Sequence, residues 1–379
     1  MNLILRRITE HVSTASPDSH PGTGLKLYSI QYLRAVAAAA VVVSHAANSL
    51  LGHTSHLIDL DYGAYGVDIF FVVSGCIMYY TTFDTGMRPS TFLVKRLIRI
   101  FPLYFVLSTA MLFLVVLSPA SFNQESPDIR AYLQSIFFIP HWNPRLHNFE
   151  PIIGQGWTLN YEMFFYLLFA ASLFLRHRLS GLAVLPIICA LVTLGRLYPA
   201  GNPVFLTYTS PLMLEFCLGI VVAASFITPA SASLRWPIVL MVALGAAIAY
   251  LYAFHAQFHA SEALRPLFVG LPCTLLVTML VAIERRGRLP TIAFLALLGD
   301  ASYSLYLVHG FVLGLGRRLW QRFVAIDSIG SHALFIALIL TASVGTALLV
   351  YRYLELRIGR ILTAAVRRFQ AGKAAAAFR

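Results

Sequence analysis

The chain has 379 residues, of which 58% are hydrophobic and only 12% are charged, with a mean hydropathy of +0.74 and a net charge of +12. Because about 25% of the residues of a typical soluble domain are charged, this composition excludes a soluble globular protein and predicts an integral membrane protein. The basic residues gather in short loops and near the C-terminus, which favours membrane topology and contact with anionic lipids over nucleic-acid binding.

Apolar runs long enough to cross a bilayer predict an all-α, polytopic membrane protein with about ten transmembrane helices. The expected spans are residues 30–51, 66–83, 100–118, 157–175, 181–198, 208–228, 236–254, 266–283, 293–316 and 332–353. A shorter apolar segment near 131–140 is expected to lie at the interface or to re-enter. We expect residues 1–27 to be a flexible cytosolic leader, 28–354 the transmembrane domain and 355–379 a basic amphipathic tail on the membrane surface.

The distribution of loop charges predicts that both termini are cytoplasmic. Basic residues precede the first span, are absent from residues 52–65 and return in alternate loops and in the tail. The loop 317–331 departs from this scheme, because it carries three arginines and yet would lie outside. The long outer loop 119–156 contains aromatic, amide and acidic side chains that suit sugar binding, although ordinary loops have a similar composition.

An arginine and a histidine lie eleven residues apart in the first span. A helix turns 100° per residue, so Arg34 and His45 share nearly one face and are separated by roughly 16 Å along the axis. Ionisable side chains at membrane depth usually face a protein interior or a water-filled cavity. The pair therefore predicts a polar path that leads inward from one surface. The alternative is an Arg34 that reaches for the interface and a His45 that only packs.

The second and third spans add one acidic and two basic residues. Asp68, near the outer start of its span, is expected either to pair with a cation or to lie among lipid headgroups. Arg96 and Arg99 are three residues apart and share a helix face. Two guanidinium groups on one face suit phosphate binding, because each offers a planar fork of donors. A role limited to fixing membrane topology remains the alternative for both arginines.

The fourth span opens with GWTLNYEMFFY, which contains Glu162. The ionised form of a carboxyl group in an apolar bundle is disfavoured unless a cation pairs with it. We therefore expect Glu162 to pair with Arg34 or to hydrogen-bond an imidazole. Trp157 and Asn160 are expected at the interface, where they can contact a sugar.

The segment LGDASYSLYLVH opens the ninth expected span. Its residues Ser302, Tyr306 and His309 fall at i, i+4 and i+7 and share one helix face. Tyr303 and Tyr306 can each donate a hydrogen bond. His309 lies half-way along the span, and a packing histidine is the alternative to a catalytic one. The four cysteines lack the paired spacing of zinc or redox sites, so no metal is expected.

Six of these segments, in order, resemble the membrane-bound acyltransferase-3 family, which O-acylates bacterial glycans. They are QYLRAVAAAAVVVSH, GVDIFFVVSG, KRLIRIFPLY, GWTLNYEMFFY, LGDASYSLYLVH and YRYLE. The family's Arg-x10-His motif matches at Arg34 and His45, and its Arg-x-x-Arg motif matches at Arg96 and Arg99. The segment GWTLNYEMFFY is similar to the corresponding segment of the family's exopolysaccharide acetyltransferases. Many relatives read SGF where Cys76 follows the glycine here, and some carry an extra periplasmic esterase-like domain that we do not expect in this chain.

The resemblance implies a multi-pass enzyme of the bacterial inner membrane that takes an acyl group from acyl-CoA, and family analogy leads us to expect that this group is acetyl. The acceptor would be a hydroxyl of a polysaccharide or a lipid-linked oligosaccharide. We expect His45 to be the general base, oriented by Glu162 or Asp68, and Arg34 to hold a phosphate or to polarise the thioester. Arg96 and Arg99 would bind phosphates of the donor. The residues expected to bind the acceptor are Asp68, Trp157, Asn160, Tyr303, Tyr306 and His309.

Three alternatives stay open at the level of the sequence. His45 could accept the acyl group covalently instead of acting as a base. The chain could be a transporter or flippase of a lipid-linked glycan, because many spans with charges at mid-membrane also suit transport. A purely structural partner in polysaccharide assembly is the third, although it leaves the buried charges unexplained.

Overall fold

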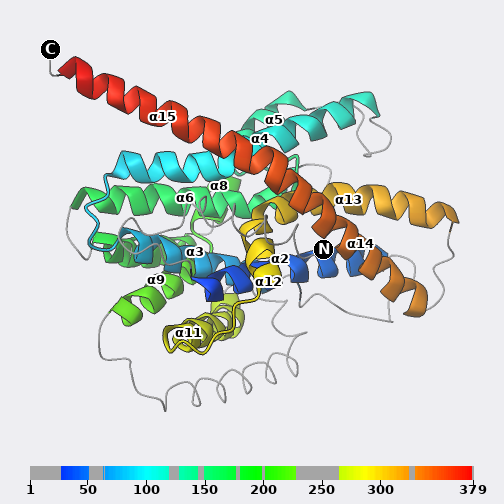
Figure 1. Ribbon diagram of the computed structural model, residues 1–379, viewed down its shortest axis with the longest axis horizontal. Coiled ribbons are helices and arrows are strands. Elements are labelled where there is room, and N and C mark those ends of the chain that lie inside the picture. Colours follow the sequence, from blue (N-terminus) through cyan, green and yellow to red (C-terminus); the bar gives the residue numbers. More distant parts are fainter. Residues whose placement is uncertain are drawn as a thin grey trace.

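The computed structural model describes residues 27–50, 63, 65–118, 128–143, 149–175, 180–198, 201–227, 264–323 and 329–377. These residues form a bundle of α-helices (Figure 1). The helices are α2 (Tyr28–Leu50), α3 (Gly66–Thr82), α4 (Pro89–Leu117), α5 (Ile129–Ile136), α6 (Trp157–Ser172), α7 (Val184–Leu197), α8 (Pro203–Tyr208), α9 (Met213–Ile227), α11 (Leu271–Arg285), α12 (Ala293–Asp300), α13 (Ser302–Phe323), α14 (Ile329–Val350) and α15 (Leu356–Ala377).

The helices confirm a polytopic membrane protein. Within the described residues, seven helices or continuous helix pairs are long and apolar enough to cross a bilayer, and a bent pair makes eight. Helix α3, at 17 residues, is apolar but shorter than these. The expected span 236–254, like most of the expected leader, lies outside the described residues. The segment expected near 131–140 overlaps the eight-residue helix α5, which is too short to cross.

Two helices differ from the boundaries expected from hydropathy. Helix α4 begins at Pro89 and continues through Pro102, so Arg96 and Arg99 lie well inside the helix. The expected single span 293–316 is instead the pair α12 and α13, bent by 72°. Glycine, aspartate and serine residues surround the bend in the sequence GDAS, and these residue types are poor helix formers in a helix interior.

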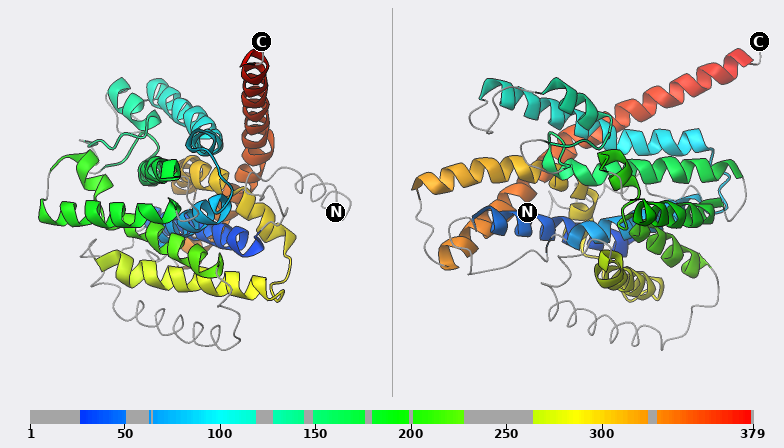
Figure 2. Two further views of the ribbon diagram at one scale, coloured as in Figure 1. Left: turned by 90° about the vertical axis from the view of Figure 1, so that its left-hand side faces the viewer. Right: turned by 180° about the vertical axis from the view of Figure 1, so that it is seen from behind.

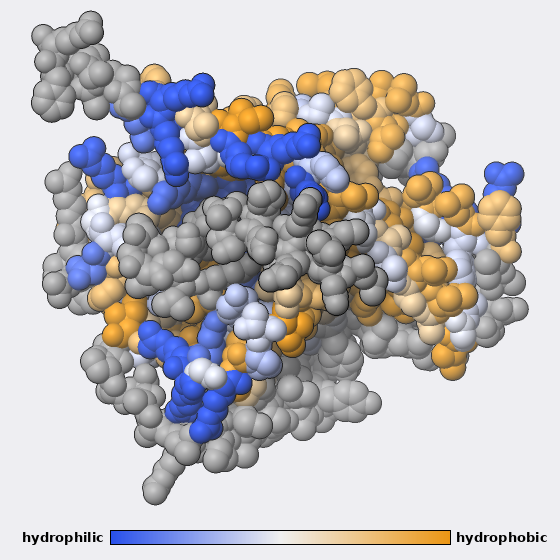
Figure 3. Space-filling view, viewed as in Figure 1, coloured by the Kyte–Doolittle hydropathy of each residue, from blue (hydrophilic) through white to orange (hydrophobic). Residues whose placement is uncertain are grey.

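The C-terminal helices form one long element. A π-helical turn, Tyr351–Glu355, joins α14 to α15 without a break, and the side chains of Tyr351 and Glu355 are buried. Helix α15 then extends away from the bundle toward the C-terminus (Figures 1 and 2). Hydrophilic side chains gather along this helix on the face shown in Figure 3, while hydrophobic side chains cover much of the opposite end of that face.

Helices α3 and α9 pack closely against each other, and glycine permits it. The Cα atom of Gly75 lies against the backbone carbonyl of Phe216, and that of Gly219 lies against the carbonyl of Val72. Small residues let helix backbones approach in membrane bundles, where packing replaces the hydrophobic effect as the main attraction. This contact fixes α3, one of the walls of the site described below.

We expect Gly75→Ala to destabilise the protein, because a Cβ atom at this position would collide with backbone that cannot rotate away. Overpacking of this kind costs about 1–3 kcal/mol. The matched control is Gly345→Ala in α14, where a Cβ atom would meet nothing within 4 Å. Thermal unfolding of the detergent-purified variants measures the difference, and equal midpoints for the two variants would contradict this account of the α3–α9 contact.

Candidate active site

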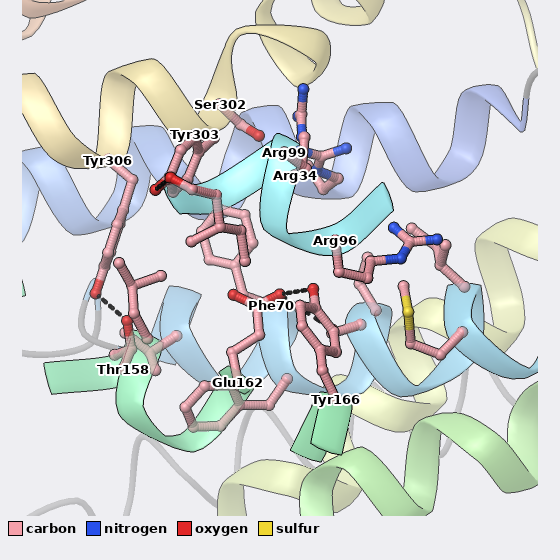
Figure 4. Close-up of a pocket in the computed structure, with 18 residues that line it drawn as sticks. Arg34, Phe70, Arg96, Arg99, Thr158, Glu162, Tyr166, Ser302, Tyr303 and Tyr306 are labelled. Atoms are coloured by element: carbon pink, nitrogen blue, oxygen red, sulfur yellow. Dashed lines mark hydrogen bonds between the residues drawn. The ribbon is translucent and has the colours of Figure 1, made fainter. Parts of the chain in front are cut away.

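Helices α2, α3, α4, α6 and α13 surround a cavity, referred to here as the central cavity (Figure 4). The empty space within it, counted together with the part open to the outside, is about 790 Å³. The predicted site residues that line it are Arg34, Arg96, Arg99, Glu162, Tyr303 and Tyr306. Side chains from segments more than 250 residues apart in the chain therefore meet around one space.

The two arginines of α4 are both at the central cavity, as their shared face predicts. Arg99 Nη1 lies 2.7 Å from Glu355 Oε1, and its Nη2 donates to the carbonyl of Asp300 at 3.4 Å. The other oxygen of Glu355 accepts a hydrogen bond from Ser304 Oγ at 2.5 Å. Arg96 lies over the ring of Phe92, 5.6 Å from its centroid. Glu355, in the π-helical turn, therefore holds Arg99 in one orientation.

Glu162 projects from α6 into the central cavity and accepts two hydrogen bonds. Ser74 Oγ donates to Glu162 Oε1 at 3.2 Å, and the hydroxyl of Tyr166 donates to the same oxygen. The expected partners of this carboxylate, Arg34 or an imidazole, do not contact it within the described residues. Neighbouring hydroxyls instead stabilise it, so Glu162 is placed at the cavity but not beside His45.

His45 meets a second histidine. Its Nδ1 lies 2.9 Å from His309 Nε2, and the two rings are 5.1 Å apart between centroids. His309 is completely buried, and its Nδ1 lies 3.2 Å from the carbonyl of Leu305. Gln155 Nε2 lies 3.2 Å from His309 Nε2. We call His45 and His309 the histidine pair.

The hydrogen bonds assign the protons of the histidine pair. A carbonyl oxygen only accepts, so His309 Nδ1 carries its hydrogen and donates it to Leu305. The Nε2 atom of His309 then holds a lone pair that accepts from Nδ1–H of His45, and the amide nitrogen of Gln155 lies 3.2 Å from the same atom. His45 in turn keeps the lone pair on its own Nε2. The arrangement therefore leaves His45 ready to accept a proton at one defined nitrogen.

A chain of hydrogen bonds connects the histidine pair to the central cavity. The hydroxyl of Tyr306, which lines the cavity, donates to the backbone carbonyl of Gln155 at 3.0 Å and lies 2.9 Å from Thr158 Oγ1. Gln155 occupies the short turn Gly154–Gly156 that precedes α6, and its amide packs against Gly310 of α13. The ring of Tyr306 lies 6.0 Å from that of His309. The histidine pair is thus next to the cavity, behind Tyr306.

The remaining predicted residues lie elsewhere. Asp68 is completely buried and pairs with Arg265 through both oxygens, at 2.9 and 2.8 Å, so it does have the cation partner expected as one of its two alternatives. It does not contact His45, and so the structure brings neither expected carboxylate to that imidazole. Asn160 is buried and Trp157 packs edge-on against Tyr161, and neither lines the central cavity.

Sequence reasoning did not assign roles to Gln155 and Glu355, which contact site residues, or to Arg265, which pairs with Asp68. Gln155 lies in a short turn, where no periodicity applies. Glu355 belongs to the YRYLE segment, which carried the family resemblance but no role, and an acidic residue at the end of an apolar run was the available signal. Arg265 immediately precedes the π-helical turn Pro266–Gly270 that leads into α11, and a basic residue at such a position is easily taken for a loop charge.

A multi-pass helical bundle with an arginine-lined cavity, and with a histidine pair beside it of which His309 is completely buried, defines a membrane protein with an internal polar site. The chain matches the acyltransferase domain family (Acyl_transf_3) over residues 27–352 and therefore belongs to the acyltransferase-3 family. It is a membrane-bound acyltransferase.

Two relatives show which kinds of acyltransferase the chain resembles. The chain is 33% identical over 253 residues to the exopolysaccharide production protein ExoZ of Rhizobium meliloti (strain 1021), covering 67% of this chain and 77% of ExoZ. It is 28% identical over 347 residues to acyltransferase MdmB of Streptomyces mycarofaciens, covering 79% of this chain and 82% of MdmB. No solved structure matches the chain.

Proposed function

We propose that this acyltransferase moves an acetyl group from acetyl-CoA to a hydroxyl of an exported polysaccharide, or of its lipid-linked precursor, at the bacterial inner membrane. The observation that supports the proposal is the central cavity, which three arginines line, together with the histidine pair that lies next to it behind Tyr306. The similarity to ExoZ, whose name refers to exopolysaccharide production, supports the class of acceptor.

The arginines support entry of the donor from the cytoplasm. Coenzyme A is made in the cytoplasm and carries several phosphates, which guanidinium groups bind well. The basic residues that precede and begin α4, Arg88 and Lys95 among them, belong on the cytoplasmic side by the positive-inside rule. Arg34, Arg96 and Arg99 would then meet the donor on its way toward the histidine pair.

The histidine pair supports general-base catalysis. The Nε2 lone pair of His45 takes the proton of the sugar hydroxyl while the hydroxyl oxygen attacks the thioester carbonyl. The tetrahedral intermediate then collapses, its C–S bond breaks, and the leaving thiolate takes the proton from His45 to give free coenzyme A and the acetyl ester. His309 accepts the Nδ1–H of His45 throughout, so it holds the ring and stabilises the imidazolium. Covalent transfer through His45 would use the same lone pair.

The direct test is transfer by the purified protein in lipid nanodiscs. Radiolabelled acetyl-CoA is supplied with chemically deacetylated exopolysaccharide fragments, and both labelled glycan and free coenzyme A are measured. We expect equal amounts of the two products, with coenzyme A release that depends on the glycan. No label on the glycan, or coenzyme A release that is the same without it, would contradict the proposed function. A transporter of glycan intermediates would show neither product.

A further inference from the structure

The N-terminus of α13 opens onto the central cavity at the bend between α12 and α13. Because the chain turns there by 72°, the first residues of the 22-residue helix α13, Ser302 and Tyr303, line the cavity. The N-terminus of a helix carries a partial positive charge and is suited to binding anions. Asp300, immediately before the bend, is buried and does not line the cavity.

Ser302 gives an independent indication of a ligand at this position. Its side chain is 0% exposed, yet its hydroxyl has no hydrogen-bond partner among the described residues. Figure 4 shows this hydroxyl directed toward the part of the cavity that carries Arg99 and Arg34. A buried hydroxyl without a hydrogen-bond partner is less favourable than a small apolar side chain at the same position. A ligand group that accepts a hydrogen bond from Ser302 would explain why a hydroxyl is present there.

The charged side chains that line the central cavity favour an anion as that group. They are three arginines and one glutamate, and because the buried carboxylates of Glu355 and Asp300 lie just behind this lining, the arginines contribute hydrogen-bond donors rather than an excess of positive charge. Glu355 lies behind the lining and fixes the guanidinium of Arg99 by an ion pair at 2.7 Å. A rigidly held guanidinium, a hydroxyl donor and a helix N-terminus on one wall are the groups that bind phosphoryl oxygens.

We propose that Ser302 and the N-terminus of α13, together with Arg34 and Arg99, form a subsite for a phosphoryl anion, either a phosphate monoester or a pyrophosphate. Under the proposed function, on which this assignment rests, the phosphoryl group belongs to coenzyme A. Seven residues separate Ser302 from His309, about 10 Å along the helix axis, a separation that the flexible arm of the donor can bridge. The other source of the same chemistry is a phospholipid headgroup.

The test compares binding by Ser302→Ala and Ser302→Asp with the unmodified protein. Coenzyme A and inorganic pyrophosphate are titrated calorimetrically against the purified full chain in nanodiscs of zwitterionic lipid, and then of lipid containing phosphatidylglycerol. We expect Ser302→Ala to weaken binding of both probes about tenfold, and Ser302→Asp to weaken it further because it adds a negative charge. The matched control is Ser343→Ala in α14, a completely buried hydroxyl that also lacks a partner among the described residues but lies outside the cavity lining.

The outcomes separate the two sources and the two proposals. Weaker coenzyme A binding in both lipids assigns the subsite to the donor. The subsite is assigned to a lipid headgroup if two results are found together. Coenzyme A binding is unchanged in the Ser302 variants, and phosphatidylglycerol displaces pyrophosphate from the unmodified protein but not from these variants. Affinities that match those of Ser343→Ala for both probes overturn the subsite. Binding is measured without turnover, so the two proposals can fail separately. Pyrophosphate binding that depends on Ser302 would support the subsite even if no acetyl transfer were found. Acetyl transfer could equally be found while the Ser302 variants bind both probes normally.

Discussion

Replacement of His45 by alanine is expected to lower acetyl transfer by about a thousandfold, the middle of the range that general acid–base groups contribute. His45 holds the lone pair that the hydrogen bonds of the histidine pair leave available at its Nε2 atom. Without it, no imidazole remains in position to take the hydroxyl proton. The measurement is the rate of glycan acetylation in nanodiscs, with O-acetyl content of surface polysaccharide as the readout in cells at matched protein levels.

A second histidine variant tests how the pair works. His309→Gln removes the ring acceptor and is expected to cost about tenfold to a hundredfold, because His45 would keep its lone pair but lose the partner that orients it. The matched control is His332→Ala, which removes another buried histidine, from α14 and outside the cavity lining. Near-normal transfer by His45→Ala, or an equal loss in His332→Ala, would remove His45 from the chemistry.

Helical periodicity was enough to predict which residues share a face. Arg96 and Arg99 both reach the central cavity, as does Arg34, and Tyr306 and His309 point from α13 toward one region. These are local relations, because 100° per residue relates side chains within a few turns of one another. Hydropathy likewise found the apolar runs, since a bilayer sets the length of each span.

The pairings between helices could not be obtained in this way. His45 and His309 are 264 residues apart, and Arg99 and Glu355 are 256 apart, so which residues meet depends on how the helices pack. Glu162 was expected beside a cation or an imidazole, yet Ser74 and Tyr166 supply hydroxyl donors that no charge argument anticipates. The bend before α13 was also not predicted, because hydropathy gives no information on the direction of the chain. The residues of α12 and α13 therefore read as one apolar run.

Loss of the Arg99 guanidinium is expected to have two separable effects. Arg99→Ala should raise the KM for acetyl-CoA at least tenfold, because it removes a guanidinium group that we propose binds a phosphate of the donor. It should also destabilise the protein by about 3 kcal/mol, since Glu355 is left as a buried carboxylate without its ion-pair partner. Both are measured on the purified protein, by initial rates and by thermal unfolding. Arg357→Ala, an exposed arginine at the start of α15, is the control and should change neither.

The double variant Arg99→Ala with Glu355→Gln distinguishes binding from stability. Glutamine in place of Glu355 removes the buried charge but keeps an oxygen that can accept from Ser304, so the double variant should regain most of the lost stability. It should not regain affinity for acetyl-CoA, because no guanidinium returns to the cavity. If the KM recovers together with the unfolding midpoint, Arg99 acts only as the structural partner of Glu355. If the KM stays high while the midpoint recovers, the ion pair positions a residue that itself binds the donor.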